Sequence, residues 1–292
     1  MNGIILVNKE QNMTSHDVVN KIRKIFKTKR VGHLGTLDPL AEGLLAVCIN
    51  DATKLVQFLT EHDKVYVAKV CIGKSTDTYD LEGAITKEAS ALDLKVDVID
   101  NAINSFLGKS TQYPPIYSSV KVNGKKLYEY ARAGLEVEIP SREIEVYDIK
   151  RISDIEYTDN CCYFDIYVHS SKGTYIRSIC NDLGVKLGLP SLMAHLTRIK
   201  SGAFTLDDAS TLSEIENGNY TLYPMLDALS EFPQVDDVRV VRFAKNGRHL
   251  TKSLIESILG DTPFQIVVKE EDKLIGIYEL INEEYKAVRV WS

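Results

Sequence analysis

The sequence predicts an α+β fold in which a mixed, largely antiparallel sheet carries helices and a small β-rich module follows. Two observations favour this class. Apolar residues recur at helical spacing in some segments and alternate in others, without the regular βαβ rhythm or the glycine-rich loop of a nucleotide-binding sheet. A chain of 292 residues, 44% of them hydrophobic, can also bury one large core and a second small one.

The first helix is predicted to begin just after Thr14. Thr14 and Asp17 have the spacing of a capping box, and apolar residues such as Val18 and Ile22 follow at helical spacing. The helix is expected to end near Thr28.

Two strands and two further helices are predicted in the middle of the chain. The strands are residues 65–72 and 162–168, and the helices are residues 97–107 and 176–187. In both strands the even-numbered residues form one apolar face. Gly73 and Gly108 follow the first strand and the first of these helices, and each glycine is expected to end its element.

The C-terminal part is predicted to be a separate small domain. Its apolar segments read as short strands separated by polar turns, which predicts a compact barrel. They are residues 238–243, 263–269, 273–280 and 285–291. The composition changes just before them, because residues 205–237 hold eight acids and no Lys or Arg. We therefore predict one domain over residues 1–231 and another over residues 232–292, with the boundary near Phe232.

The net charge of −6 alone argues against a polyanionic partner, but the charges are segregated. Residues 21–30 hold six basic side chains and no acid, and Lys121, Lys125 and Lys126 lie close together. This distribution permits a basic groove on an acidic protein. A solvated helix face is the alternative.

The sequence also limits the location and the redox chemistry. No run of 18 uncharged apolar residues is present, and the N-terminus lacks a basic leader with a cleavage site, so we expect a cytoplasmic protein. The five cysteines have no C-x-x-C spacing, which argues against a disulfide framework and against a zinc site. They are expected to be reduced thiols in or near the core.

Several short motifs follow one another along most of the chain. They are GHLGTLDPLAEGLL at residues 32–45, KVY at 64–66, TDTYDLEG at 76–83, a long YPPIYSSVKVNGKKLYEYARAG block at 113–134, SKGTYIRS at 171–178 and HLTRIKSGAF at 195–204. Together they resemble the bacterial tRNA pseudouridine-55 synthase family over residues 3–210. The final module is similar to RNA-binding domains of the PUA type.

The chain departs from the family pattern at three positions. Glu10 stands where proline is usual, Asn12 where glycine is usual, and Leu34 where threonine is frequent. Asn tolerates the left-handed conformation that glycine would supply, so the turn at Asn12 can form.

The resemblance implies an isomerase that converts the uridine at position 55, in the T loop of tRNA, to pseudouridine. The reaction detaches uracil, turns it and rejoins it through carbon, without net redox change, so no cofactor and no metal are expected. It needs a carboxylate acting as nucleophile or base, shielded from water, and Asp38 is the candidate. Taken alone, Asp38-Pro39 reads as the start of a turn.

The resemblance also implies roles for other site residues. Arg177 is expected to keep the Asp38 carboxylate ionised. Tyr66 is expected to stack on the uracil and to help move the proton from its carbon 5. Tyr175 and Leu196 are expected to line the uridine pocket. Without the motifs, these residues read as packing or as a surface ion pair.

Extrusion of the target nucleotide and contact with phosphates involve further residues. His33 is expected to support the flipped nucleotide, and Asp77 to hold neighbouring loops. Lys9, the basic helix and the loop from Lys121 to Lys126 are expected to contact phosphates, and this contact should weaken as salt rises. Each lysine alone reads as an ordinary surface charge.

The expected partner is the T arm of tRNA, bound by a monomer without a protein partner or a membrane. Three rivals stay open at this stage. The first is a related synthase with another RNA target or a guide RNA, and the second is a tRNA-binding or tRNA-folding module. The third is a glycoside hydrolase, which requires a second acid facing Asp38. Glu42 is close in sequence, but no motif assigns it that task.

Overall fold

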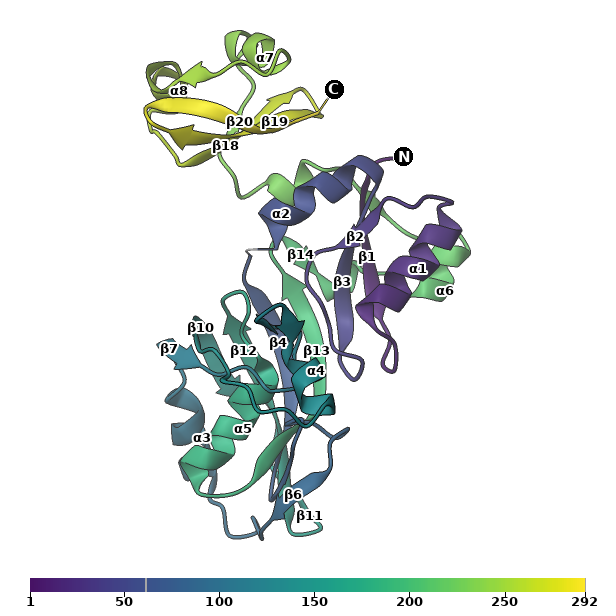
Figure 1. Cartoon of the computed structure of the whole chain (residues 1–292), viewed down its shortest axis with the longest axis vertical. Helices are drawn as coiled ribbons and strands as arrows, with labels where there is room; N and C mark the ends of the chain where they lie inside the picture. Colours follow the sequence, from purple (N-terminus) through teal and green to yellow (C-terminus); the bar gives the residue numbers. More distant parts are fainter. Residues whose placement is uncertain (61, 292) are drawn as a thin grey trace.

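The computed structural model describes residues 1–60 and 62–291. Its main sheet contains eleven strands of the described chain, eight of them in one continuous path (Figure 1). In spatial order these are β15 (Leu222–Tyr223), β1 (Gly3–Lys9), β3 (Glu42–Ile49), β13 (Ser191–Ser201), β4 (Lys64–Ile72), β12 (Cys161–Ser170), β10 (Arg142–Arg151) and β7 (Gly108–Gln112). Three short strands pair at the side of this path: β2 (Val31–His33) with β3, β14 (Phe204–Thr205) with β13, and β11 (Glu156–Thr158) with β12.

The pairing confirms a mixed, largely antiparallel sheet. The exception within it is the pair β13 and β3, which run parallel over a short register, Thr197 with Glu42 and Arg198 with Gly43. We call this pairing the seam, because it joins the half of the sheet that holds β1 and β3 to the half that holds β4, β12, β10 and β7. The predicted strands 65–72 and 162–168 are confirmed as β4 and β12, and their even-numbered residues lie in one core cluster.

Three helices cover one face of the sheet and fill that core: α1 (Ser15–Ile25), α3 (Val96–Asn104) and α5 (Ile176–Leu187). The capping box of Thr14 and Asp17 is confirmed. Helix α1 ends three residues before the predicted Thr28, because Lys27 has a positive φ of 49° and cannot continue a right-handed helix. Helix α3 likewise ends three residues early, and the chain turns before Gly108 starts β7.

The opposite face of the β1 and β3 half packs against two other parts of the chain. One is the segment of the short helices η1 (Asn50–Leu55) and α2 (Val56–Leu59), and the other is the C-terminal sheet. Val267, Leu274, Ile277 and Trp291 share one core cluster with Phe58 and its neighbours. The indole Nε1 of Trp291 also donates a hydrogen bond to the carbonyl of Asp51, at 3.3 Å.

The C-terminal sheet is a curled half-barrel of the PUA type, seen at one end of the molecule (Figure 1). Its order is β16 (Gln234–Val235), β18 (Gln265–Glu270), β19 (Lys273–Ile281), β20 (Glu284–Val290) and β17 (Leu250–Thr251), with helices α7 (Val238–Ala244) and α8 (Lys252–Leu259). The predicted strand at residues 238–243 is wrong, because this segment forms α7. Asp237 caps that helix by accepting the backbone N–H of Arg239, and Val240, Val241 and Ala244 face the core.

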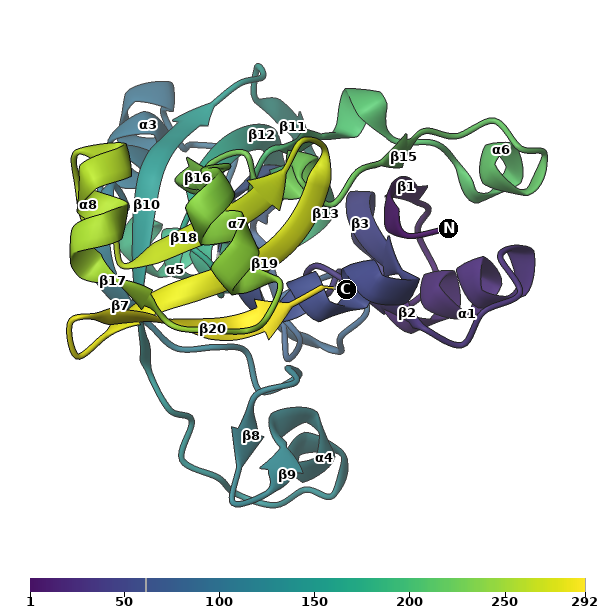
Figure 2. The same ribbon diagram turned by 90° about the horizontal axis from the view of Figure 1, so that it is seen from above.

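Two peripheral features complete the fold. Residues 113–141 contain the hairpin β8 (Lys121–Val122) and β9 (Lys125–Lys126) and helix α4 (Leu127–Arg132), which project away from the body (Figure 2). A second small hairpin pairs β5 (Lys74–Thr76) with β6 (Ile85–Glu88), and α6 (Leu212–Glu216) lies beside α1.

All five cysteines are buried free thiols, as predicted.

Candidate functional site

A cleft of about 280 Å³ opens where the two halves of the main sheet meet. Its walls come from the loop after β2, from β4, from β13, from the start of α5 and from the segment between β7 and β8. Asp38, Tyr66, Tyr175, Arg177 and Leu196 all line it. Five of the seven residues that the sequence analysis assigned to the site therefore meet in one place, although they come from four separate segments.

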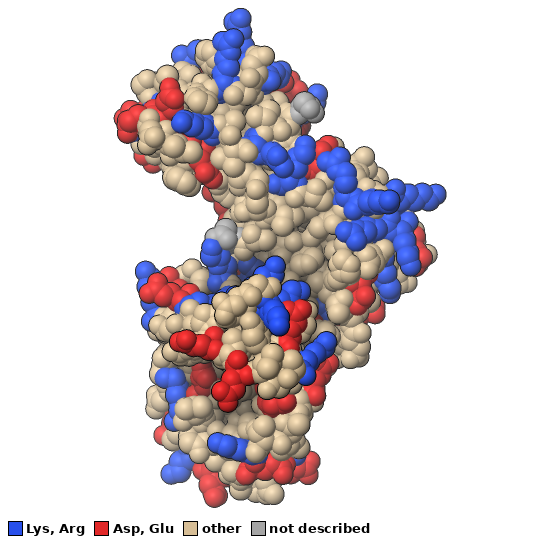
Figure 3. Space-filling model, in the orientation of Figure 1, with Lys and Arg blue, Asp and Glu red and all other residues tan. Residues whose placement is uncertain are grey.

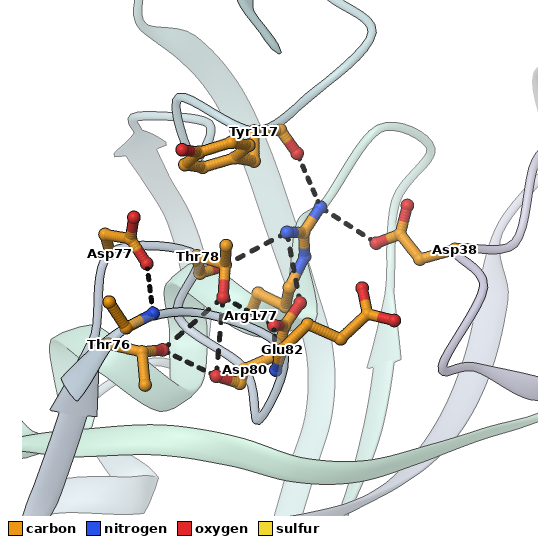
Figure 4. Close-up of polar contacts among 9 residues, drawn as sticks. Asp38, Thr76, Asp77, Thr78, Asp80, Glu82, Tyr117 and Arg177 are labelled. Carbon is orange, nitrogen blue, oxygen red and sulfur yellow. Dashed lines mark hydrogen bonds and ion pairs between the residues drawn. The ribbon is translucent and has the colours of Figure 1, made fainter. Parts of the chain in front are cut away.

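Arg177 holds the Asp38 carboxylate at the edge of this cleft. Its Nη2 atom lies 2.9 Å from Asp38 Oδ2 and also donates to the carbonyl of Tyr117 at 3.0 Å (Figure 4). The Arg177 side chain is 6% exposed, whereas that of Asp38 is 41% exposed. One carboxylate edge is therefore fixed by a buried cation, while the rest is accessible to a ligand.

A second carboxylate, Asp80, pairs with the other end of the same guanidinium. Arg177 Nη1 lies 3.3 Å from Asp80 Oδ2 and donates to the carbonyl of Thr78 at 3.1 Å. Asp80 is itself fixed, because its Oδ1 accepts from Thr78 Oγ1 at 2.5 Å and from the backbone N–H of Glu82 at 3.0 Å. Asp80 was missed in the sequence analysis, although it lies within the TDTYDLEG motif that was singled out.

The turn that carries Asp80 explains the residue types of this motif. Thr76 Oγ1 donates to the carbonyl of Asp80 at 2.5 Å, and Asp77 Oδ1 accepts the backbone N–H of Ala84 at 2.8 Å (Figure 4). Asp77 thus closes its own turn between β5 and β6, whereas the sequence analysis expected it to hold neighbouring loops. A side chain on Gly83 would collide with Asp77 Oδ1 and Thr78 Oγ1, so only glycine lets the turn close.

Tyr66 lies on β4 directly opposite Arg198 on β13. Arg198 is fully buried and donates from Nε to the carbonyl of Leu44 at 2.8 Å, from Nη2 to that of Gly35 at 3.1 Å and from Nη1 to that of Thr36 at 3.4 Å. Burial lowers the pKa of Arg198, and its contact with the Tyr66 hydroxyl opposes this shift. Arg198 was also missed, although it lies in the HLTRIKSGAF motif.

The expected phosphate contact of Lys9 is wrong in this structure. The Lys9 side chain is completely buried, and its Nζ donates to the carbonyls of Met13 at 2.7 Å, Glu10 at 3.0 Å and Pro39 at 3.4 Å. These three carbonyls use all the donors of an ammonium group. Burial lowers the pKa of Lys9 to about 8. Lys9 instead ties the loop that follows Asp38 to the turn at Asn12, which has the expected positive φ of 63°.

The remaining predicted residues differ in how close they lie to the cleft. Tyr175 precedes α5, and Gln112 holds it through two hydrogen bonds, one to its backbone N–H at 2.8 Å and one from Gln112 Nε2 to its carbonyl at 3.0 Å. Leu196 is buried on β13. His33 ends β2 and is outside the cleft lining formed by the described residues, although Gly35 two residues later belongs to it. Burial lowers the pKa of His33, which favours the neutral imidazole.

Glu42 does not face Asp38 across the cleft. Its Oε1 lies 3.3 Å from His195 Nε2 and 3.3 Å from Thr197 Oγ1, at the start of β3. Among the described residues, the cleft lining contains Asp38 as its single acidic side chain. This geometry does not support the two-acid arrangement of a glycoside hydrolase.

The basic residues form an exposed surface beside the cleft. The N-terminal end of α1 touches the Asp38 loop, since Ser15 Oγ donates to the carbonyl of Leu37 at 3.0 Å. From there Lys21, Lys24 and Lys27 extend outward as exposed side chains. Figure 3 shows Lys and Arg side chains gathered over α1, while acidic and basic side chains are mixed over the lower part of the molecule. The exposed Lys121 and Lys125 lie on the projecting hairpin.

The sequence matches the TruB family pseudouridylate synthase (N terminal domain) over residues 23–176. This chain belongs to that family. Proteins named tRNA pseudouridine synthase B from Staphylococcus aureus strains Newman and USA300 are each 44% identical over 289 residues, which cover 95% of this chain and 94% of the relative. Membership of the TruB family makes the protein a pseudouridine synthase, an isomerase, and the family predicted from the motifs is confirmed.

Solved structures agree on the fold. An H/ACA RNP bound to a substrate RNA containing 2′-deoxyuridine has a chain with a TM-score of 0.72 at 22% identity, covering 99% of this chain and 85% of that chain. A Cbf5-Nop10-Gar1 complex gives a TM-score of 0.69 at 24% identity, with 99% and 84% covered. At these identities the likeness concerns the α+β architecture with its C-terminal module. Within the described ranges, no helix combines the length and apolar character that crossing a membrane requires.

Proposed function

We propose that this protein converts the uridine at position 55 in the T loop of tRNA to pseudouridine, with Asp38 as the nucleophile. The observation that carries the proposal is the half-exposed Asp38 carboxylate held at 2.9 Å by buried Arg177 in a cleft that also contains Tyr66. The name of the 44% identical relatives, tRNA pseudouridine synthase B, supports tRNA as the substrate.

In this mechanism each site residue has a physical role. Arg177 holds one carboxylate edge of Asp38 and aims the side chain at the ribose. Asp80 prevents the guanidinium from turning away. Tyr66 supports the extruded uracil by stacking and helps move the proton from carbon 5, while Tyr175 and Leu196 line the uridine pocket.

We also propose how the rest of the molecule serves the reaction. Extruding the target nucleotide costs roughly a few kcal/mol, and we assign its support to His33 and contacts around the cleft. Exposed lysines of α1 and of the hairpin β8–β9 contact phosphates of the T arm. The protein acts as a cytoplasmic monomer. Its catalytic domain spans residues 1–231 and its PUA-like domain residues 232–292, of which residue 292 lies outside the described residues.

The test uses an unmodified tRNA transcript and maps pseudouridine by chemical labelling and primer extension. The unchanged protein should modify position 55 alone, and Asp38→Asn should lose activity by on the order of 10³-fold or more while tRNA affinity changes little. Asp148→Asn, an exposed aspartate on β10, is the control and should act normally.

Each alternative gives a different result in this experiment. Modification outside the T loop would overturn the assigned position and keep the reaction class. A tRNA that is bound but never modified would indicate a binding or folding module. Full activity of Asp38→Asn would remove the assigned nucleophile.

A further inference from the structure

Two buried cations, Lys64 and Arg198, lie side by side at the floor of the cleft. Both residues line the cleft, and Lys64 is 7% exposed and Arg198 1% exposed. They flank the same glycine, since a Cβ atom built on Gly35 would lie 3.4 Å from Lys64 Cε and 3.5 Å from Arg198 Nη1. The floor of the cleft therefore concentrates positive charge out of contact with water.

Unlike Arg177, these two cations form no ion pair with a carboxylate among the described residues. Arg177 lies between Asp38 and Asp80. By contrast, no carboxylate in the described part of the chain lies within 4.0 Å of the charged nitrogens of Lys64 or Arg198. Lys64 Nζ donates to the carbonyls of His62 at 2.6 Å and Thr60 at 3.4 Å. Backbone carbonyls therefore supply the hydrogen-bond acceptors of both cations, and the Tyr66 hydroxyl is a further contact of Arg198.

The donor count leaves capacity for a ligand. An ammonium group has three N–H donors and a guanidinium five. Lys64 uses two of them on carbonyls, and Arg198 uses three on carbonyls. Even if the Tyr66 hydroxyl takes one more donor of Arg198, each cation keeps at least one N–H without a protein acceptor among the described residues.

Burying a charge without a countercharge is costly unless another group compensates it. Burial and, second, the charge on Arg198 lower the pKa of Lys64 to about 8, and the smaller effect of the Asp63 carboxylate opposes them. Entry of negative charge into the cleft would offset this cost. The position beside Tyr66, the proposed stacking platform, favours a charge on the uracil over a charge on a phosphate.

We propose that Lys64 and Arg198 stabilise the negative charge on the uracil while it is detached from the ribose, an inference that rests on the function proposed above. When Asp38 attacks C1′ and the C1′–N1 bond breaks, the electron pair of that bond leaves with the base and spreads over N1, O2, O4 and C5. C5 then uses an electron pair to form the C1′–C5 bond as the bond from C1′ to the Asp38 carboxylate breaks, and the proton on C5 moves to N1. Fixed positive charge in a dry site acts most strongly on charge that develops during the reaction.

The test compares two tRNA substrates that differ in how well the base holds negative charge. One carries uridine at position 55 and the other 5-fluorouridine, whose fluorine withdraws electrons and stabilises the detached base. Lys64→Met and Arg198→Gln remove one positive charge each. Single-turnover rates of base rearrangement are measured by nuclease digestion, chromatography and mass spectrometry.

We expect each variant to lose on the order of 10- to 10²-fold on uridine. On 5-fluorouridine the loss should be several-fold smaller, because the better leaving group needs less help. Arg198→Lys keeps the positive charge but not the planar guanidinium group. Its rate on uridine should fall less than that of Arg198→Gln. Equal losses on both substrates would overturn the inference and leave only a structural role.

Controls separate this inference from folding and from the proposed function. Lys69→Met alters another lysine of β4, which pairs with exposed Glu156 at 3.4 Å, and its rates should be unchanged on both substrates. Thermal unfolding and tRNA binding identify variants that do not fold. If Arg198→Gln does not fold, the two substrates are compared with Lys64→Met alone. If the unchanged protein does not modify position 55, the proposed function fails. If the unchanged protein modifies position 55 but the variants lose equally on both substrates, the proposed function stands and only the role assigned to Lys64 and Arg198 is wrong.

Discussion

At Arg177 the two carboxylate partners differ in exposure, and this difference separates their roles. Asp38 faces the cleft, whereas Asp80 is 6% exposed and receives hydrogen bonds from its own turn. A buried carboxylate of this kind acts by holding a cation in place. The carboxylate of Asp38, the proposed nucleophile, depends on that cation for its direction.

Asp80→Asn tests this division of roles. The amide keeps the shape of the side chain but removes the charge that fixes Arg177. We expect the single-turnover rate of pseudouridine formation to fall by about 10- to 100-fold, with tRNA affinity nearly unchanged. Asp93→Asn, an exposed aspartate outside the cleft, serves as the control. A normal rate in Asp80→Asn would show that the guanidinium keeps its position without the charge of Asp80.

The sequence motifs were sufficient to identify Asp38, Tyr66 and Arg177 as neighbours in one site, but they do not report burial. Lys9 reads as an ordinary surface charge, yet the fold encloses it and three carbonyls take its donors. The environment of Arg198 could not be predicted either. Its acceptor carbonyls lie 154 to 163 residues earlier in the chain, so only the assembled sheet shows them.

At the scale of elements, the seam between β3 and β13 depends on one glycine. Gly43 has a φ of +96° and lies opposite Arg198, and a Cβ atom there would lie 2.5 Å from the Arg198 carbonyl oxygen. An L-residue at this position would be strained and would also push the two strands apart.

We expect Gly43→Ala to lower the free energy of unfolding by about 3 kcal/mol, since backbone strain and a steric collision combine. Gly218→Ala provides the matched control. Gly218 also has a positive φ, of 85°, but nothing lies within 4 Å of its added Cβ, so about 1 kcal/mol is expected there. Urea unfolding measures both values. Equal losses would mean that the strands at the seam can adjust without cost.

Element prediction succeeded where one periodicity dominated and failed where two competed. The alternation in β12 was clear, because the even-numbered residues of the predicted strand are apolar and buried, and the composition of β4 favoured a strand on both of its faces. Residues 238–243 contain three valines, a composition typical of strands. Yet Val240, Val241 and Ala244 also have helical spacing, and the Asp237 cap together with packing against the C-terminal core selects the helix.

For the whole molecule, the net charge of −6 conceals a surface suited to RNA. Helix α1 touches the Asp38 loop at Ser15, and its exposed Lys21 and Lys24 lie about two turns further along the helix, so an extended RNA backbone can reach them and the cleft together. Electrostatic binding of this kind releases counterions and weakens with salt.

We therefore expect the double variant Lys21→Gln/Lys24→Gln to bind tRNA more weakly at low salt. The slope of log K against log[salt] should become shallower by about 1.5, because each phosphate contact contributes roughly 0.7 to 0.9. The control is Lys87→Gln/Lys95→Gln, two exposed lysines near β6 and α3. An unchanged slope in the first variant would exclude α1 from the interface.

The seam has a consequence for how the protein is made. The loop bearing Asp38 emerges from the ribosome early, but Arg198, which donates hydrogen bonds to the carbonyls of Gly35 and Thr36 in that loop, is synthesised much later. Contacts so distant along the chain form late, since most of the catalytic region must be synthesised before they can close. A growing polypeptide thus carries Asp38 on a loop that Lys9 and Ser15 already contact but that Arg198 cannot yet support, and the complete cleft arises only after residue 198 has been synthesised.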